Sequence, residues 1–175
     1  MVALLRGINV GGNKTVPMAD LRAIVEKAGF NGVSTFINSG NVIFEGSKKA
    51  AEVEAALEGA IEKRFKFEVP VIVRTAEQWA VYAKGTPFKS AQKTRAKAVQ
   101  LCVAQGPIDK GALALLREKA TTEKVELAGD AFWIYYPAGI PRSKLSPALL
   151  DRAAGSPVTA RNWNTVLTLA ELLGS

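Results

Sequence analysis

The sequence contains no histidine and only one cysteine, Cys102. Without an imidazole there can be no Ser-His-Asp triad, no Cys-His dyad and no histidine-ligated metal. A single cysteine cannot form a disulfide within the chain, which is typical of a protein kept in a reducing compartment. The acidic residues show no metal-ligand spacing and no paired carboxylates, so we assign no catalytic residue, no metal and no cofactor.

Long apolar runs are also absent. The longest, Ala131–Tyr136, is far shorter than the roughly 20 residues that a membrane helix needs. The first residues lack the basic and apolar segments of a secretory signal. We therefore expect a cytoplasmic protein without a membrane span. Its 175 residues, 48% of them apolar and 22% charged, are enough for one compact domain or two small ones.

The charge is positive, with 23 basic and 16 acidic residues and a net charge of +7. Part of it is concentrated in residues 84–97, which contain no acid and five cations: Lys84, Lys89, Lys93, Arg95 and Lys97. Such a field favours anionic partners and accelerates their encounter. A modest net charge also keeps a small protein in solution without any ligand. Both interpretations remain open at this stage.

Hydrophobic periodicity predicts a similar order of elements in the two halves, with the last strand expected only in the first half. In the first half, strands are expected at 2–6, 33–37, 41–45 and 69–74, with helices near 17–28 and 47–65. The order strand, helix, strand, strand, helix, strand is the split β-α-β, or ferredoxin-like, plan. After a short helix at 75–84, the second half predicts strands at 98–104, 125–127 and 131–136, with helices near 108–119, 144–154 and 162–173.

We therefore predict an α+β chain of two ferredoxin-like lobes, with antiparallel sheets and helices. Residues 1–84 form the first lobe with its following short helix, residues 85–97 a basic linker, and residues 98–175 the second lobe with a C-terminal helix. The first strand is apolar on both faces, as expected of a strand that is covered on both sides. For this reason we expect the two lobes to pack into one unit.

The loop Gly7–Lys14 is the most suggestive candidate site, because it links a strand to a helix and is rich in glycine. Backbone amides around Gly11 and Gly12 are able to approach an anion closely in such a loop. The alternative is a tight turn with positive φ at Gly11, Gly12 and Asn13. In a ferredoxin-like sheet the first and third strands pair, which would bring Arg6, Asn9 and Asn41 to one edge of the sheet.

Other polar residues have structural explanations. Ser143 is a natural helix N-cap with Lys144 as a surface cation, and Asn162 is a natural cap for the last helix. Arg161 and Asn164 flank that cap and need a partner. Alternation along residues 132–136 places Phe132, Ile134 and Tyr136 on one face of a strand and Trp133 and Tyr135 on the other, which favours packing over base stacking.

Several of these segments together resemble a known family. They are Leu5-Arg6-Gly7-Ile8-Asn9-Val10-Gly11-Gly12-Asn13-Lys14, Val16-Pro17-Met18, Ser39-Gly40-Asn41-Val42, Ser143-Lys144-Leu145 and Arg161-Asn162-Trp163-Asn164-Thr165-Val166. In this order they resemble the bacterial domain-of-unknown-function family 1697. The resemblance implies two ferredoxin-like lobes in one chain, and it implies no activity.

The first functional hypothesis is binding of an anion, either a nucleotide-like phosphate or a nucleic acid. The candidate residues are Arg6, Asn9, Gly11, Gly12, Asn13, Lys14, Asn41, Lys144, Arg161, Asn162 and Asn164. These residues are cationic or neutral and include no acid. A histidine-free enzyme that uses Arg and Lys electrostatics is one alternative. A structural or protein-interaction module, whose loops only hold the lobes together, is the other.

Overall fold

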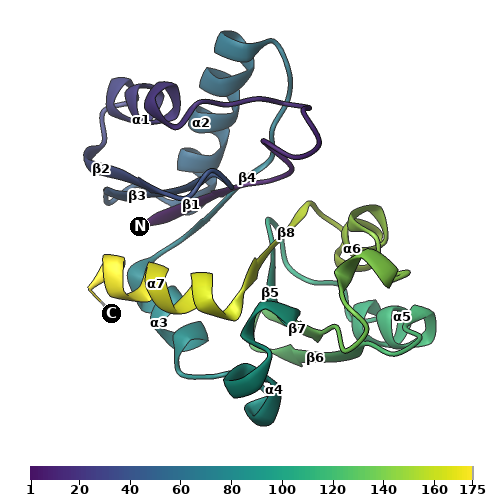
Figure 1. Cartoon of the computed structure of the whole chain (residues 1–175). Coiled ribbons are helices and arrows are strands. Elements are labelled where there is room, and N and C mark those ends of the chain that lie inside the picture. Colours follow the sequence, from purple (N-terminus) through teal and green to yellow (C-terminus); the bar gives the residue numbers. More distant parts are fainter. Residues whose placement is uncertain (175) are drawn as a thin grey trace. The chain divides into compact units, whose positions relative to one another are not determined.

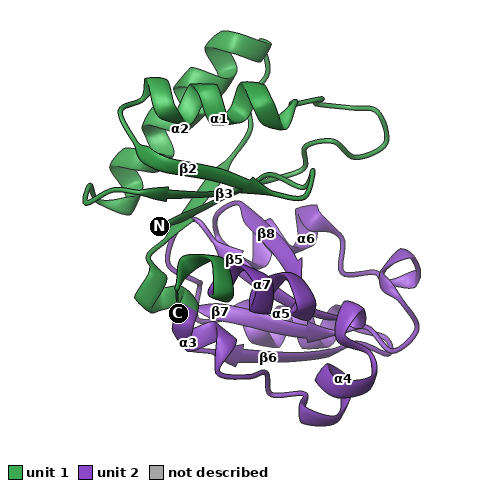
Figure 2. Cartoon of the chain, turned by 60° about the vertical axis from the view of Figure 1, so that its left-hand side comes forward, with its two compact units in different colours: residues 1–79, 171–175 green, residues 80–170 purple. Residues whose placement is uncertain are grey.

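The computed structural model describes residues 1–174, which form two compact units. The first unit comprises residues 1–79 together with the end of the chain from residue 171, and the second comprises residues 80–170 (Figure 2). Each unit contains one four-stranded antiparallel sheet.

The first unit follows the predicted order of elements (Figure 1). These are β1 (Val2–Leu5), α1 (Met18–Lys27), β2 (Asn31–Phe36), β3 (Asn41–Glu45), α2 (Ala50–Phe65) and β4 (Val71–Arg74). The strands lie in the order β2-β3-β1-β4, with α1 and α2 on one side of the sheet (Figure 1). This is the ferredoxin-like arrangement, and the prediction for this half is confirmed.

The second unit repeats the arrangement. Its elements are α4 (Lys89–Thr94), β5 (Val99–Ala104), α5 (Ala112–Lys119), β6 (Lys124–Ala128), β7 (Ala131–Tyr135), α6 (Pro147–Ala154) and β8 (Val158–Asn162). Two further helices, α3 (Ala76–Ala83) and α7 (Trp163–Leu173), span the divisions between the units. The strand order β6-β7-β5-β8 matches that of the first sheet, so the chain is α+β with two ferredoxin-like lobes.

Strand β8 is the element that sequence periodicity did not predict. Its five residues include Arg161 and Asn162, and this polar content hides the short Val-Thr strand signal. Pairing with β5, in the register Cys102 with Ala160, defines the strand instead. Within residues 85–97, the structure forms the short helix α4 and the start of a 3-10 turn, Ala96–Ala98.

The core of each unit lies between its sheet and two helices. In the first unit, alternate residues of β1 such as Ala3 and Leu5 pack with α1 and α2, while Val2 and Leu4 on the opposite face are also buried. Burial of β1 on both faces is therefore confirmed. In the second unit Phe132, Ile134 and Tyr136 belong to the core with α5 and α6.

The other face of the second sheet carries aromatic side chains, as alternation predicted. Trp133 packs edge-on against Trp163 of α7, with the ring centroids 5.7 Å apart. Tyr135, at the end of β7, lies beside Phe88, with the ring centroids 6.0 Å apart. Aromatic side chains thus cover part of this face within the second unit.

The outward amides of the edge strand β4 are satisfied by carboxylates from the preceding helix. In the first unit, Val71 N–H donates to Glu58 Oε1 at 2.9 Å, and Val73 N–H donates to Glu54 Oε1 at 2.8 Å. Glu54 and Glu58 are one helical turn apart on α2, so their spacing matches alternate residues of β4. These bonds attach α2 to the strand that closes the sheet.

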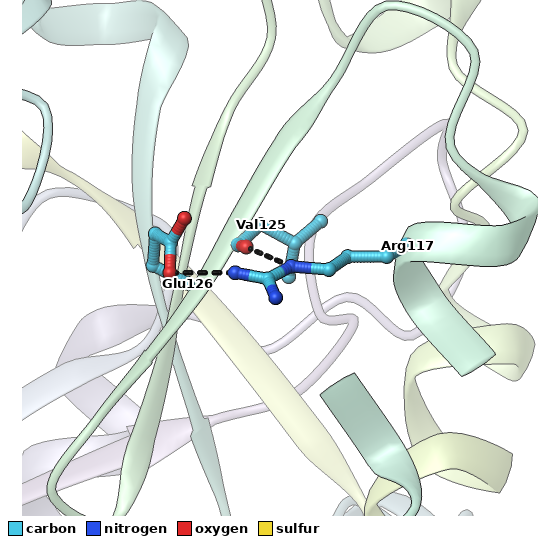
Figure 3. Close-up of polar contacts among 3 residues, drawn as sticks. All are labelled: Arg117, Val125 and Glu126. Atoms are coloured by element: carbon cyan, nitrogen blue, oxygen red, sulfur yellow. Dashed lines mark hydrogen bonds and ion pairs between the residues drawn. The ribbon is translucent and has the colours of Figure 1, made fainter. Parts of the chain in front are cut away.

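Both edge strands of the second sheet are also held by side chains from helices. Val158 N–H of β8 donates to Asp151 Oδ1 of α6 at 2.9 Å. At the opposite edge, Arg117 of α5 donates from Nε to the carbonyl of Val125 at 3.1 Å and from Nη2 to Glu126 Oε2 at 2.7 Å (Figure 3). Such side chains protect sheet edges from pairing with other chains.

The carboxyl group of Glu54 gives the first testable prediction. Burial raises its pKa, and the hydrogen bond from Val73 and the charge of Arg74 offset only part of that rise. A raised pKa in the folded state contributes stability below the unfolded value of 4.5, and this contribution is lost as the pH rises through the folded pKa. Glu54→Gln keeps an acceptor for Val73 without an ionisable group. In the parent protein, the contribution of Glu54 makes the free energy of unfolding fall as the pH rises. We expect this part of the fall to be absent in the Glu54→Gln variant.

Urea unfolding at a series of pH values from 4.5 upward tests this expectation. Glu62→Gln, an exposed position on the same helix, is the matched control and should retain the slope of the parent protein. Equal pH dependence in the parent and Glu54→Gln proteins would contradict the assignment.

Candidate functional site

In the first unit, Gly11 and Gly12 form the centre of a two-residue hairpin turn. Their φ angles are 60° and 77°, as a type I′ turn requires. The turn is closed by Asn13 N–H, which donates to the carbonyl of Val10 at 3.2 Å, and by Asn9 N–H, which donates to the carbonyl of Lys14 at 3.2 Å. Positive φ was expected at Asn13 but occurs instead at Asn9 and Lys14, which flank the turn.

This turn differs from an anion-binding loop at the end of a helix. Helix α1 begins only at Met18, with Pro17 as its N-cap, so the two glycines do not belong to its first turn. The amides of Gly11 and Gly12 are exposed and have no acceptor within residues 1–174. Their role as an anion cradle stays a prediction.

Asn9 joins this loop to the turn between β2 and β3. Its Nδ2 donates to the carbonyl of Val16 at 3.0 Å and to the carbonyl of Asn38 at 2.8 Å. Its Oδ1 accepts a hydrogen bond from Val16 N–H at 2.8 Å. All three contacts are internal, so the side chain of Asn9 supports the loop from within.

The neighbouring candidates also form internal contacts. Asn41 is fully buried, and its Nδ2 donates to the carbonyl of Phe36 at 2.9 Å. Lys14 Nζ donates to the carbonyl of Glu68 at 2.7 Å. Arg6 directly follows β1 and is half-buried, and its backbone N–H donates to the carbonyl of Pro70 at 3.0 Å. Together with the bond from Leu5 N–H to the carbonyl of Gly40 at 2.8 Å, these contacts connect the end of β1 to the start of β3 and to the segment before β4.

In the second unit, Arg161 and Asn162 have structural contacts as well. Arg161 is buried, and its Nη1 donates to Thr159 Oγ1 and to the carbonyl of Ala160, both at 2.8 Å. Burial lowers the pKa of its guanidinium to about 10. Asn162 Oδ1 accepts from Thr165 N–H at 3.1 Å, which confirms it as the cap of α7.

Asn164 is exposed and lines a hollow that we call the α4–α7 hollow. Its volume is about 590 Å³ and its lining residues are Lys93, Thr94, Arg95, Ala96, Lys97, Ala98 and Asn164. Three of these are cations and none is an acid. Arg95 is held in place by Tyr135: its Nη1 donates to the phenol oxygen at 3.2 Å, and its guanidinium carbon lies 5.9 Å from the ring centroid.

Lys144 lines a second hollow, which we call the α5–α6 hollow. Its volume is about 480 Å³ and its lining residues are Lys119, Lys144, Ser146, Ala148, Leu149 and Arg152. Ser146, rather than the predicted Ser143, caps α6, because its Oγ accepts from Leu149 N–H at 3.2 Å. Ser143 Oγ instead accepts from Leu145 N–H at 3.0 Å. Lys119 is paired with Glu118 at 2.7 Å, whereas Lys144 and Arg152 form no ion pair with any residue that the structure describes.

The candidate set missed five of the six cations in these two hollows. Lys93, Arg95 and Lys97 were recognised only as a basic stretch of sequence. Their position just before β5 could have indicated that they lie near Asn164, because β5 pairs with β8, the strand that precedes Asn164. Because β8 was not predicted, that neighbourhood was not recognised.

Cys102 and the acidic residues offer no further site. Cys102 is buried in β5, and burial raises the pKa of its thiol to about 12. In the described part of the chain, no three Cys, Asp or Glu side chains gather as a metal site would require. No described helix has both the length and the apolar character needed to cross a membrane.

The contacts of Asn9 lead to the second prediction. Asn9→Gly retains the positive φ but removes three hydrogen bonds, so we expect it to lower stability by about 1–3 kcal/mol and the melting temperature by several degrees. Asn13→Gly is the control, because Asn13 is an exposed neighbour whose side chain makes no hydrogen bond within residues 1–174. Thermal unfolding measures both variants. If the Asn9→Gly and Asn13→Gly variants have the same melting temperature, the Asn9 amide does not support the loop.

The chain resembles known proteins in its family signature and in its fold. A search of curated proteins finds no match. Among solved structures, the conserved bacterial protein SP0830 from Streptococcus pneumoniae is similar with a TM-score of 0.75 and 20% identity, over 98% of this chain and 97% of that chain. At this identity the likeness shows the shared fold. Over residues 1–133 the chain matches the family described as protein of unknown function (DUF1697). The segments at 143–145 and 161–166 lie beyond the matched range, which nevertheless covers most of the chain, and the chain belongs to the DUF1697 family.

Proposed function

We propose that this chain binds an anionic ligand that carries phosphate, either a nucleotide or a nucleic acid, at the α4–α7 hollow. The observation that carries the proposal is the composition of the hollow: Lys93, Arg95 and Lys97 line it together, and no acid does. Its volume of about 590 Å³ lies within the range of ligand pockets.

The lining groups have complementary chemistry toward phosphate. Arg95 offers a planar set of donors that suits two phosphate oxygens at once. Its contact with Tyr135 limits the side-chain freedom that would be lost on binding. Lys93 and Lys97 contribute compact charges, and the exposed amide of Asn164 offers both a donor and an acceptor to orient the ligand.

The electrostatics of the hollow also favour an anion. Neither Lys93 nor Lys97 has an acidic partner within residues 1–174, so an incoming phosphate need not displace an existing ion pair. In contrast, Arg117 elsewhere in the unit is already engaged by Glu126 and the carbonyl of Val125 (Figure 3). Within residues 1–174, no acid is therefore paired with the lysines of the α4–α7 hollow, whereas an acid already neutralises Arg117.

The glycine turn of the first unit is a weaker candidate for the same function. Its exposed amides at Gly11 and Gly12 remain available, whereas Asn9, Lys14 and Asn41 use their polar groups internally. These internal bonds favour a structural role for this part of the family signature. The proposed ligand site is accordingly centred on the second unit.

Substitution of Arg95 and Lys97 tests the proposal. Each loss of one phosphate contact should weaken binding of a labelled single-stranded hexanucleotide roughly fivefold at about 0.1 M salt. It should also reduce the salt slope, meaning the steepness with which log affinity falls with log salt concentration, by about 0.7. Arg95→Gln and Lys97→Gln are compared with Lys110→Gln, which removes one exposed charge just before α5. Fluorescence anisotropy at about 50 and about 200 mM salt gives affinity and slope, with a nucleoside triphosphate as competitor.

The control separates a local site from a general charge effect. If all three variants weaken binding equally, the protein attracts anions only through its net charge, and the α4–α7 hollow is not a site. If none of them weakens binding, the proposal is wrong. Selective loss in Arg95→Gln and Lys97→Gln supports it.

A further inference from the structure

The two cationic hollows of the second unit lie at the same end of its sheet. The strand register aligns Lys124 with Tyr135 and Tyr135 with Val99 across that end. The α4–α7 hollow is adjacent to this end of the sheet, because its lining residue Ala98 immediately precedes Val99 and its lining residue Asn164 closely follows the end of β8. This end of the sheet therefore marks the position of the first hollow.

The α5–α6 hollow reaches the same end through two helices that lie side by side (Figure 1). Lys119 is the last residue of α5, five residues before Lys124 at the start of β6. Ser146 caps the first turn of α6, whose last turn lies at the opposite end of the sheet, where Asp109 N–H donates to the carbonyl of Ala154 at 3.4 Å. The first turn of α6 thus lies at the end that carries Tyr135, and the second hollow extends from that turn along α6 to Arg152.

The hollows are on opposite sides of the sheet. Helices α5 and α6 pack on the face that carries Phe132 and Ile134. Trp163, the neighbour of Asn164, packs with Trp133 on the other face. A ligand that occupied both hollows would have to turn around the end of the sheet.

Charge is distributed unevenly between the two ends of this sheet. At the end shared by the hollows, Lys124 and Arg142 are exposed and add to the cations already named. The acids there are Glu118, paired with Lys119 at 2.7 Å, and Glu123, whose carboxylate accepts from the backbone N–H groups of Thr121 and Thr122. The opposite end carries the exposed acids Asp109 and Asp130, the exposed Lys110, and Arg152 in the last turn of α6.

From this arrangement we propose that the phosphate-bearing ligand is a single-stranded nucleic acid that continues from the α4–α7 hollow around the end of the sheet into the α5–α6 hollow. The inference rests on the proposed function and extends it from one phosphate site to a track. A duplex, with a persistence length of about 50 nm, is too stiff for such a turn. A single strand is flexible, and its phosphates are able to follow separated cations.

Aromatic side chains lie beside the start of this track. Tyr135 is half-exposed at the sheet end and lies close to the ring of Phe88 and to the guanidinium of Arg95. Proteins that bind single strands combine cations along the backbone with aromatic rings for the bases. The second hollow supplies Lys144 and Arg152 for phosphates and has no aromatic residue in its lining.

The experiment compares a labelled trinucleotide with a labelled strand of about 15 nucleotides, as DNA and as RNA. Lys97→Gln should weaken both lengths, while Lys144→Gln should weaken only the long strand, roughly fivefold at about 0.1 M salt with a salt slope lower by about 0.7. Lys110→Gln, at the opposite end of the sheet, should change neither. All three positions are exposed, and unchanged melting temperatures confirm that the variants are folded.

The outcomes separate this inference from the proposed function. If Lys97→Gln weakens both lengths but Lys144→Gln leaves the long strand unchanged, the proposed function stands and the track is wrong. If Lys97→Gln affects neither length, the α4–α7 site itself fails. A duplex that competes as well as the single strand also overturns the track. Equal affinities for DNA and RNA indicate that the protein recognises phosphate and base. A higher affinity for RNA indicates that it also recognises the 2′-hydroxyl.

Discussion

The last strand of each unit lies at the edge of its sheet, and the outward-facing amides of such a strand need acceptors that no neighbouring strand provides. A buried donor without a partner costs about 1–3 kcal/mol, so this requirement constrains the whole unit. Carboxylates of the preceding helix meet it: Glu54 and Glu58 on α2 for β4, and Asp151 on α6 for β8. The same bonds hold the second helix of each unit against the strand that completes its sheet.

The two units share more than this edge. Each last strand contains valine and, three residues later, a buried arginine: Val71 and Arg74 in β4, and Val158 and Arg161 in β8. Each arginine donates from Nη1 to the carbonyl of the residue before it, at 2.9 Å for Arg74 and 2.8 Å for Arg161.

A polar residue directly follows each of these arginines. Thr75 Oγ1 accepts from Gln78 N–H at 3.2 Å, and Asn162 Oδ1 accepts from Thr165 N–H at 3.1 Å, so each begins the next helix. The similarity of the two units therefore extends from strand order to individual contacts. The matching valine and arginine are too few to be found by comparing the sequences of the two halves.

Much of the fold could be predicted from sequence, because strong hydrophobic periodicity determined most elements. Strand β3 was predicted with its observed bounds, Asn41–Glu45, and the alternation of residues 132–136 gave the correct faces. Strand β8 could not be predicted, because its polar residues have no periodic signal and only pairing with β5 defines it. The role of Asn9 was missed for a similar reason, since its partner Asn38 lies 29 residues away.

The position of the candidate site follows from the edge strand. Asp151 holds β8, whose register pairs Asn162 with Gln100, and Gln100 Nε2 in turn donates to the carbonyl of Lys97 at 2.8 Å. This connection brings Asn164, at the start of α7, to the hollow lined by the cations that precede β5. Asn9 and Lys14, in the glycine loop of the first unit, use their side chains to brace it. The polar loop residues of the first unit therefore stabilise its framework. In the second unit, the framework places three cations together in the lining of one hollow, and no acid belongs to that lining.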